Sequence, residues 1–197
     1  MMYAFVGIDP SITNTGLVIL DSSGSVLEAA DGKMAYKGHK FQCSTEKYIR
    51  QADYLIRILS RYKGMIAGIA YENYSFNSVH KGYSLAEYGG ILKSRLWQDL
   101  NCDVHLIAPA TNKKFATGFG MCGKNAVIEC AQKEVTRFWE HKPSEDIADA
   151  YFLARIAMYL SLPETSAGLD RNCPHAAVRS EIASRLRGYE SLEAAND

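Results

Sequence analysis

The sequence lacks the features that mark membrane proteins, secreted proteins and small metal-stabilised domains. It has no run of about 18 apolar residues, the length that a membrane-spanning helix needs. Residues 1–16 carry no basic residue and include the acidic Asp9, so we expect no signal peptide and a cytoplasmic location. The cysteines are odd in number and form no Cys-x-x-Cys pair, which argues against a disulfide framework or a zinc ribbon: Cys43, Cys102, Cys122, Cys130 and Cys173.

Net charge is also absent, because 22 Lys and Arg balance 22 Asp and Glu. The balance conceals an asymmetry: residues 33–124 carry 14 basic and 6 acidic residues, whereas both flanking segments are acidic. A basic middle is compatible with a polyanion-binding face opposed to acidic groups, but charge bias alone is a weak indicator and favours helices whose lysines are merely solvated. No Gly-x-x-x-x-Gly-Lys-Ser/Thr loop for ATP is present.

What is present predicts one α/β domain followed by a tail. With 197 residues, 47% of them hydrophobic, the chain has the size and composition of a globular domain. Short apolar runs predict strands at 3–9, 16–21, 25–32, 65–71 and 103–109. The first three are joined by short turns and should form an antiparallel meander. The fourth is apolar on both faces, which favours a central, parallel strand.

Helical periodicity predicts the remaining elements. Apolar residues at 3–4 spacing indicate helices at 45–62, 79–100, 125–140 and 144–161, the last ended by Pro163. Gly89 and Gly90 inside the second helix cost about 1 kcal/mol each relative to Ala, which indicates a close contact or a break. We expect a loop at 110–124 and divide the chain into a domain at 1–162 and a tail at 163–197 with a short helix at 176–188.

Four acidic residues stand where α/β proteins place functional groups. Asp9 closes the first predicted strand and Glu72 follows the fourth, so parallel neighbouring strands would bring them side by side. Asp146 and Asp149 stand three apart at a helix start, with Cβ atoms about 5–6 Å apart on one face. Taken singly, each also fits a structural role, such as a turn residue or a partner of the helix dipole capped by Ser144.

Taken together, the four acids predict a cation site. Carboxylates that converge near a core repel one another, and a bound cation relieves that repulsion. Oxygen ligands without a His or Cys motif favour Mg²⁺, with Mn²⁺ as a substitute, over Zn²⁺. Two such ions about 3.5–4 Å apart would support in-line hydrolysis of a phosphodiester.

These residues carry a resemblance. The segments GIDPSITNTG (7–16), YEN (71–73), PATNKKFATGFGMCGK (109–124) and DIADA (146–150) resemble, in order, the motifs of the RuvC family of Holliday junction resolvases. The resemblance spans about residues 4–160 and implies an RNase H-like fold, a mixed five-stranded sheet flanked by helices. Ser11 departs from the Gly that the family usually has after Asp-Pro, and the sequence drift suits a phage or viral member.

The resemblance also implies residue roles. Asp9, Glu72, Asp146 and Asp149 would hold the metal, and Lys124 would lie near the scissile phosphate. Lys113, Lys114 and Lys81 are expected to contact DNA phosphates. The family often has a wedge aromatic three residues after its Glu, where this chain has Ser75. Tyr74 and Phe76 on either side are candidates to stack on unpaired bases, or to pack under the loop.

The function implied is a homodimeric, Mg²⁺-dependent endonuclease that resolves four-way DNA junctions by paired nicks. A two-fold dimer, formed through the helix at 79–100, suits a substrate with two-fold symmetry. The alternatives are another RNase H-like nuclease acting on forks, flaps or RNA–DNA hybrids, and a junction-binding or packaging-associated module with little turnover. The missing ATP loop means that any branch migration requires a separate partner.

Overall fold

The five strands form one mixed sheet. The computed structural model describes residues 3–36, 38–74, 82–135 and 142–193. The strand order is β3-β2-β1-β4-β5, with antiparallel pairing of β1 with β2 and β2 with β3, and parallel pairing of β1 with β4 and β4 with β5. The meander and the central parallel strand are therefore confirmed. The strands are β1 Ala4–Asp9, β2 Gly16–Asp21, β3 Val26–Asp31, β4 Ile66–Glu72 and β5 His105–Ile107.

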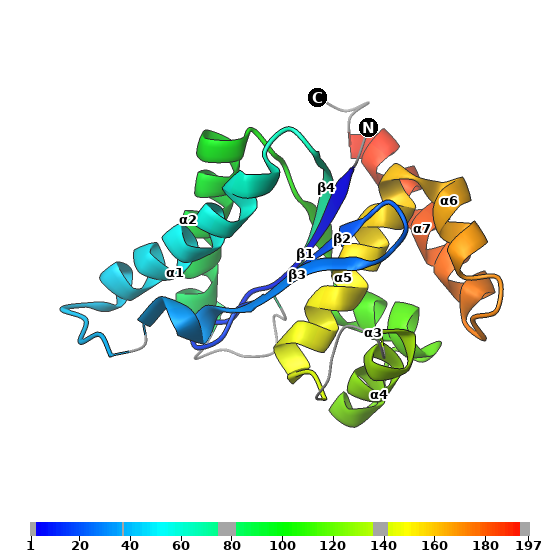
Figure 1. Ribbon diagram of the computed structural model, residues 1–197, viewed down its shortest axis with the longest axis horizontal. Coiled ribbons are helices and arrows are strands. Elements are labelled where there is room, and N and C mark those ends of the chain that lie inside the picture. Colours follow the sequence, from blue (N-terminus) through cyan, green and yellow to red (C-terminus); the bar gives the residue numbers. More distant parts are fainter. Residues whose placement is uncertain (1–2, 37, 75–81, 136–141, 194–197) are drawn as a thin grey trace.

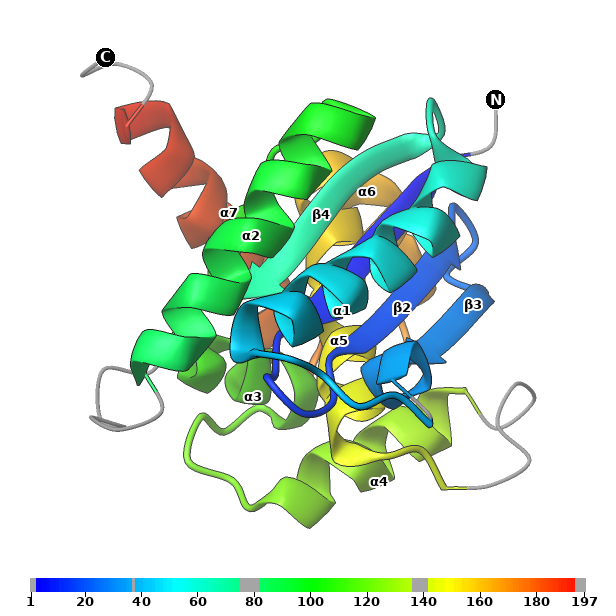
Figure 2. The ribbon, with the colours of Figure 1, turned by 90° about the vertical axis from the view of Figure 1, so that its left-hand side faces the viewer.

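Helices cover both faces of this sheet (Figure 1). One face is covered by α1 (Ser44–Leu59) and α2 (Gly82–Leu100), which lie in front of the strands in Figure 2. The other face is covered by α5 (Glu145–Ser161), with α3 (Pro109–Thr117), α4 (Lys124–Glu134), α6 (Pro163–Leu169) and α7 (Ala176–Glu193) around it. Short 3-10 turns lie at Gly32–Tyr36 and Ser60–Tyr62. Within the described part of the chain, no helix has the length and apolar character needed to cross a bilayer.

The two-residue period of β1 and β4 decides which side chains meet α5. Val6 and Ile8 of β1 pack with α1 and α2, so Phe5 and the residues in step with it face α5. In β4, Tyr71 faces α1 and α2, and Ala70 faces α5. The same alternation turns the strand-ending acids of both strands towards α5.

Helix α5 lies unusually close to the sheet because glycines line its path. A Cβ on Gly7 would stand 1.9 Å from the backbone oxygen of Ala150, and one on Gly16 would stand 2.0 Å from that of Asp146. No side chain fits in either place, so the backbones touch. This contact fixes the height of the first turns of α5 above the ends of β1 and β2.

Three predicted features were wrong in detail. Residues 110–124 do not form a continuous loop, since α3 occupies Pro109–Thr117 with Phe115 and Ala116 buried. The fifth strand is shorter than expected, with three residues. Beyond residue 162, helix α6 was not expected, and α7 runs further than the short helix at 176–188; both pack against α5. The sequence pattern of these helices is not clearly amphipathic, because some of their polar side chains are buried in ion pairs.

We expect Gly7→Ala to lower the free energy of unfolding by about 3 kcal/mol or more, at the upper end of overpacking effects, because backbone atoms of α5 cannot move aside. Urea denaturation measures this change. Gly90→Ala in α2 is the control, since, apart from its chain neighbours and the helix backbone around it, no described atom lies within 4 Å of the added Cβ, and Ala favours a helix by about 0.5–1 kcal/mol. Equal effects of the two changes would contradict the close contact of β1 with α5.

Candidate active site

The structure brings the four predicted acids to one edge of the sheet. Asp9 is the last residue of β1 and Glu72 the last of β4, and the two strands are parallel neighbours paired up to Ile8 and Tyr71. Asp146 and Asp149 lie in the first turns of α5, above this edge. The helix starts where expected, because the backbone N–H of Ile147 donates to the Ser144 hydroxyl at 3.3 Å.

The electrostatics of Asp9 shows that these carboxyl groups interact. Burial raises the pKa of Asp9 well above its ordinary value, and the negative charges of Glu72, Asp149 and Asp146 raise it further. Residues that are 63 to 140 positions apart in the sequence therefore act on one group. The edge of the sheet concentrates negative charge in a partly buried place.

Glu72 titrates near neutrality. Burial and the neighbouring Asp149 raise its pKa to about 7, while a hydrogen bond with the Asn112 side chain and the charge of Lys113 oppose the rise. Asn112 and Lys113 both belong to α3. This helix, which stands in place of a predicted loop, thus supplies the groups that favour the ionised form of Glu72.

Two buried asparagines, which were not among the predicted site residues, hold the aspartates of α5. The Asn14 amide donates to Oδ2 of Asp146. The Asn112 amide, which is fully buried, donates to the backbone oxygen of Asp149 at 3.2 Å and lies 3.5 Å from its Oδ1. Both residues stand inside the motif segments, next to a Thr-Gly turn and to Lys113, and this position is the one signal that could have identified them.

The turn after β1 is built to present Asn14. The Ser11 hydroxyl accepts the backbone N–H groups of Thr13 and Asn14 at 3.3 and 3.4 Å. Thr15 is buried and bonded to Gln51 at 2.6 Å and to the Tyr88 hydroxyl at 2.8 Å, which ties the turn to α1 and α2. The serine that departs from the family pattern therefore has a structural role, since its hydroxyl closes the turn that carries the Asp146 partner.

The donors of this site suit a hard divalent cation. They are carboxylate oxygens, the ligand type that Mg²⁺ prefers. The amides of Asn14 and Asn112 bond to the two aspartates, and their own amide oxygens are buried without a hydrogen-bond partner among the described residues. Across the described ranges, no three His, Cys, Asp or Glu side chains are arranged as a closed metal-binding group. The site is a cluster of repelling oxygen donors that a cation would draw together.

The predicted DNA-binding lysines do not all lie in this site. Lys113 acts on Glu72, whereas Lys114 points to α7 and lies 4.0 Å from Glu181. Lys124 is the first residue of α4, but its side chain is outside the described part, as is all of Lys81.

Tyr74, one of the two aromatic candidates, packs against α2. A Cβ on Gly89 would stand 1.7 Å from its hydroxyl, and Lys93 Nζ lies 5.7 Å from its ring centre. Gly89 therefore marks a close contact within a continuous helix, which is one of the two outcomes that the sequence predicted for the Gly89–Gly90 pair, whereas Gly90 is uncrowded. Phe76 lies outside the described residues, so a wedge role for that ring stays a prediction.

Some known proteins are similar to this chain in sequence, and others are similar in fold. No protein-family model matches the chain. The chain is 25% identical over 156 residues, 79% of its length and 97% of the relative's, to the crossover junction endodeoxyribonuclease RuvC of Prochlorococcus marinus (strain NATL1A). A structure of T. thermophilus RuvC in complex with a Holliday junction substrate has a TM-score of 0.61 at 19% identity, covering 77% of this chain and 90% of that one. A second structure of Thermus thermophilus RuvC has a TM-score of 0.59 at 17% identity, covering 87% and 96%. The structures establish the RNase H-like fold predicted from the sequence.

We expect Asp9→Asn to unfold at a higher temperature than the wild type in metal-free buffer at about pH 8. A carboxyl group whose pKa is raised by folding binds its proton more tightly in the folded state, so its contribution to stability falls as pH rises above the ordinary value of about 4. Because Asn cannot ionise, the variant does not lose folding stability as the pH rises.

Melting curves without Mg²⁺ measure the stability gained by the substitution, and melting curves with Mg²⁺ measure the stabilisation by the bound cation. Mg²⁺ should raise the melting temperature of the wild type and leave that of Asp9→Asn nearly unchanged. A wild type that Mg²⁺ does not stabilise, or a mutant that is less stable than the wild type at this pH, would contradict a cation site at Asp9.

Proposed function

We propose that this chain, a member of the RuvC family of Holliday junction resolvases, is a metal-dependent endonuclease that resolves four-way DNA junctions. The observation that carries the proposal is the convergence of Asp9, Glu72 and the two aspartates of α5 at one sheet edge. A fold alone would not identify a function, but this group of acids is a specific chemical site.

The four carboxylates are the proposed ligands, and Mg²⁺ is the proposed cation, with two ions in each active site. Cations held there would supply an activated water and stabilise the leaving oxygen of the phosphodiester. Asn14 and Asn112 keep the aspartates of α5 in place through hydrogen bonds. Lys113 contributes a positive charge beside Glu72, where a phosphate of the substrate would also be attracted.

A homodimer is the proposed active form, with α2 at its centre. Two large apolar side chains of this helix are exposed, Tyr83 by 83% and Trp97 by 57%. Exposed apolar surface of this kind is typical of an interface. Two active sites related by a two-fold axis would cut opposed strands of a junction with the same symmetry. The proposed place of action is the cytoplasm.

We expect Asp146→Asn to abolish cleavage of a four-way junction while junction binding remains within about two-fold of wild type, because phosphate contacts by lysines supply the affinity. Single-turnover cleavage and gel-shift titration measure the two properties. Asp103→Asn is the control, since this exposed acid precedes β5 at the opposite edge of the sheet and should retain full activity. Forks, flaps and RNA–DNA hybrids serve as competing substrates, and preferential cleavage of one of them would replace the junction as the substrate.

Lys124→Ala is expected to slow the cleavage step at saturating enzyme, because the proposed contact of Lys124 is with the phosphate that is cut. Lys133→Ala, an exposed lysine near the other end of α4, should leave the rate unchanged. An effect confined to affinity and recovered at low salt would make Lys124 an ordinary backbone contact.

A further inference from the structure

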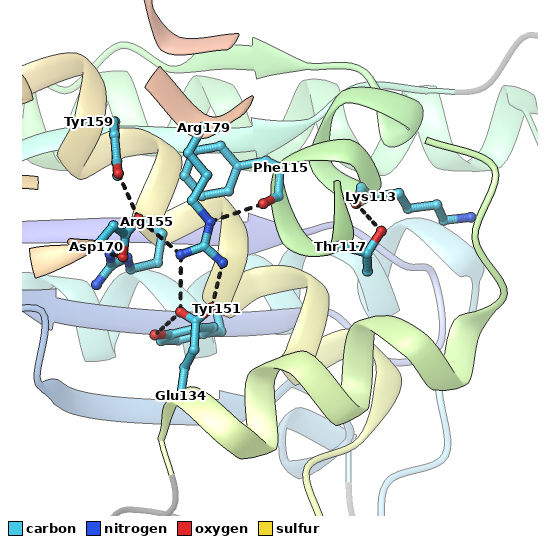
Figure 3. A network of polar contacts seen from close by, with 9 residues as sticks. All are labelled: Lys113, Phe115, Thr117, Glu134, Tyr151, Arg155, Tyr159, Asp170 and Arg179. Atoms are coloured by element: carbon cyan, nitrogen blue, oxygen red, sulfur yellow. Dashed lines mark hydrogen bonds and ion pairs between the residues drawn. The ribbon is translucent and has the colours of Figure 1, made fainter. Parts of the chain in front are cut away.

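A buried arginine of α7 joins four helices on the α5 side of the molecule. Arg179 has no exposed surface, which is unusual for a residue with a permanent charge. Figure 3 shows its guanidinium at the centre of a polar network. The carboxylates of Glu134, at the end of α4, and of Asp170, just after α6, bind two of its nitrogens. The rings of Phe115 and Phe152 lie 5.0 and 5.4 Å from its central carbon.

The charges of this network are balanced. Asp170 also pairs with Arg155 and accepts a hydrogen bond from the Tyr159 hydroxyl at 2.6 Å. Glu134 accepts another from the Tyr151 hydroxyl at 3.1 Å. Two arginines therefore face two carboxylates. A balanced buried network of this type is often no more stable than apolar residues of the same volume, so stability alone does not account for an arginine here.

The remaining bond of Arg179 reaches towards the candidate active site. Its Nε donates to the backbone oxygen of Phe115 at 3.0 Å. Phe115 stands in the last turn of α3, where backbone oxygens lack partners within the helix and a cation is favoured by the helix dipole. The residue three positions earlier is Asn112, which holds Asp149, and Lys113 lies between them. The guanidinium therefore closes the end of the helix that supports the acids.

We propose that Arg179 is a positioning residue for the nuclease reaction, which sets the depth of α3 and through it the places of Asn112 and Lys113. The part of the chain beyond residue 162 then supports the active site structurally, through the contact of α7 with α3. A second, exposed link supports this assignment, since Glu181 of α7 lies 4.0 Å from Lys114 of α3. The inference rests on the proposed function wherever turnover is measured.

Arg179→Lys is the informative change. Lysine retains the positive charge between Glu134 and Asp170, but its single ammonium cannot also reach the Phe115 oxygen in the forked geometry of a guanidinium. We expect a fall in single-turnover rate of about ten-fold or more at saturating enzyme, because small displacements of positioning groups have large effects on rate. Junction affinity should stay within about two-fold.

Arg187→Lys is the matched control. Arg187 lies on the same helix and donates to the backbone oxygen of Tyr159 in α5 at 2.8 Å, and among the described residues it has no hydrogen bond or ion pair with α3. The Arg187→Lys change should leave the single-turnover cleavage rate unchanged. If Arg179→Lys does not fold, the double change Arg179→Met with Glu134→Gln removes one charge of each sign and should show the same loss of rate with unchanged affinity.

Amide hydrogen exchange separates positioning from general stability. In Arg179→Lys, amides of residues 110–118 should exchange at least about ten-fold faster, while those of β1 and β4 retain their protection. Uniformly faster amide exchange throughout the protein would overturn the proposal. So would an unchanged single-turnover cleavage rate together with unchanged protection of α3. If the wild type cleaves no four-way junction, the proposed function fails. Selective loss of α3 protection in Arg179→Lys would still establish that Arg179 holds α3 in place.

Discussion

The arrangement of this molecule depends on the contact between the backbone of α5 and the first two strands. Gly7 and Gly16 leave no room for a side chain, so the helix lies directly on the sheet. Its first turns are thereby held above the ends of β1 and β4. A helix at the usual distance would separate its aspartates from Asp9 and Glu72, and the acids would be solvated independently. Two glycines thus determine that four ordinary carboxyl groups act on one another.

Neutral hydrogen-bond donors, as well as positive charge, stabilise the converging carboxylates. Asn14 bonds to Asp146 and Asn112 to Asp149, and each comes from a segment with its own buried anchor. Thr15 anchors the first segment against α1 and α2, and Phe115 anchors the second against Arg179. Neutral amides hold the carboxylates without neutralising them, so the negative charge needed to attract a cation is preserved.

The sequence predicts the elements whose apolar pattern is regular, and it fails where polar residues are buried. Short apolar runs predicted the strands, and the fourth run, which is apolar on both faces, predicted the parallel centre of the sheet. The ends of those runs and the start of the helix located Asp9 and Asp146. Helix α3 lies in a segment expected to be a loop because residues 110–124 contain several Gly and Lys residues. Its Asn112 is fully buried, with the amide bonded to the backbone oxygen of Asp149. The docking of α7 was also unforeseen, since a buried arginine is indistinguishable in sequence from a solvated one. Contacts made by tertiary structure alone leave no periodic signal.

The position of Arg179 has a consequence for biosynthesis. The residue follows Asp149 by 30 positions, so a ribosome adding about 5–20 residues per second completes all four acids roughly 1.5–6 s before the residue that closes the end of α3. The nascent chain therefore passes through a stage in which the sheet and the acids exist without the support of α7. If Arg179 positions α3 as proposed, the newly made protein would reach its full cleavage rate only after α7 docks.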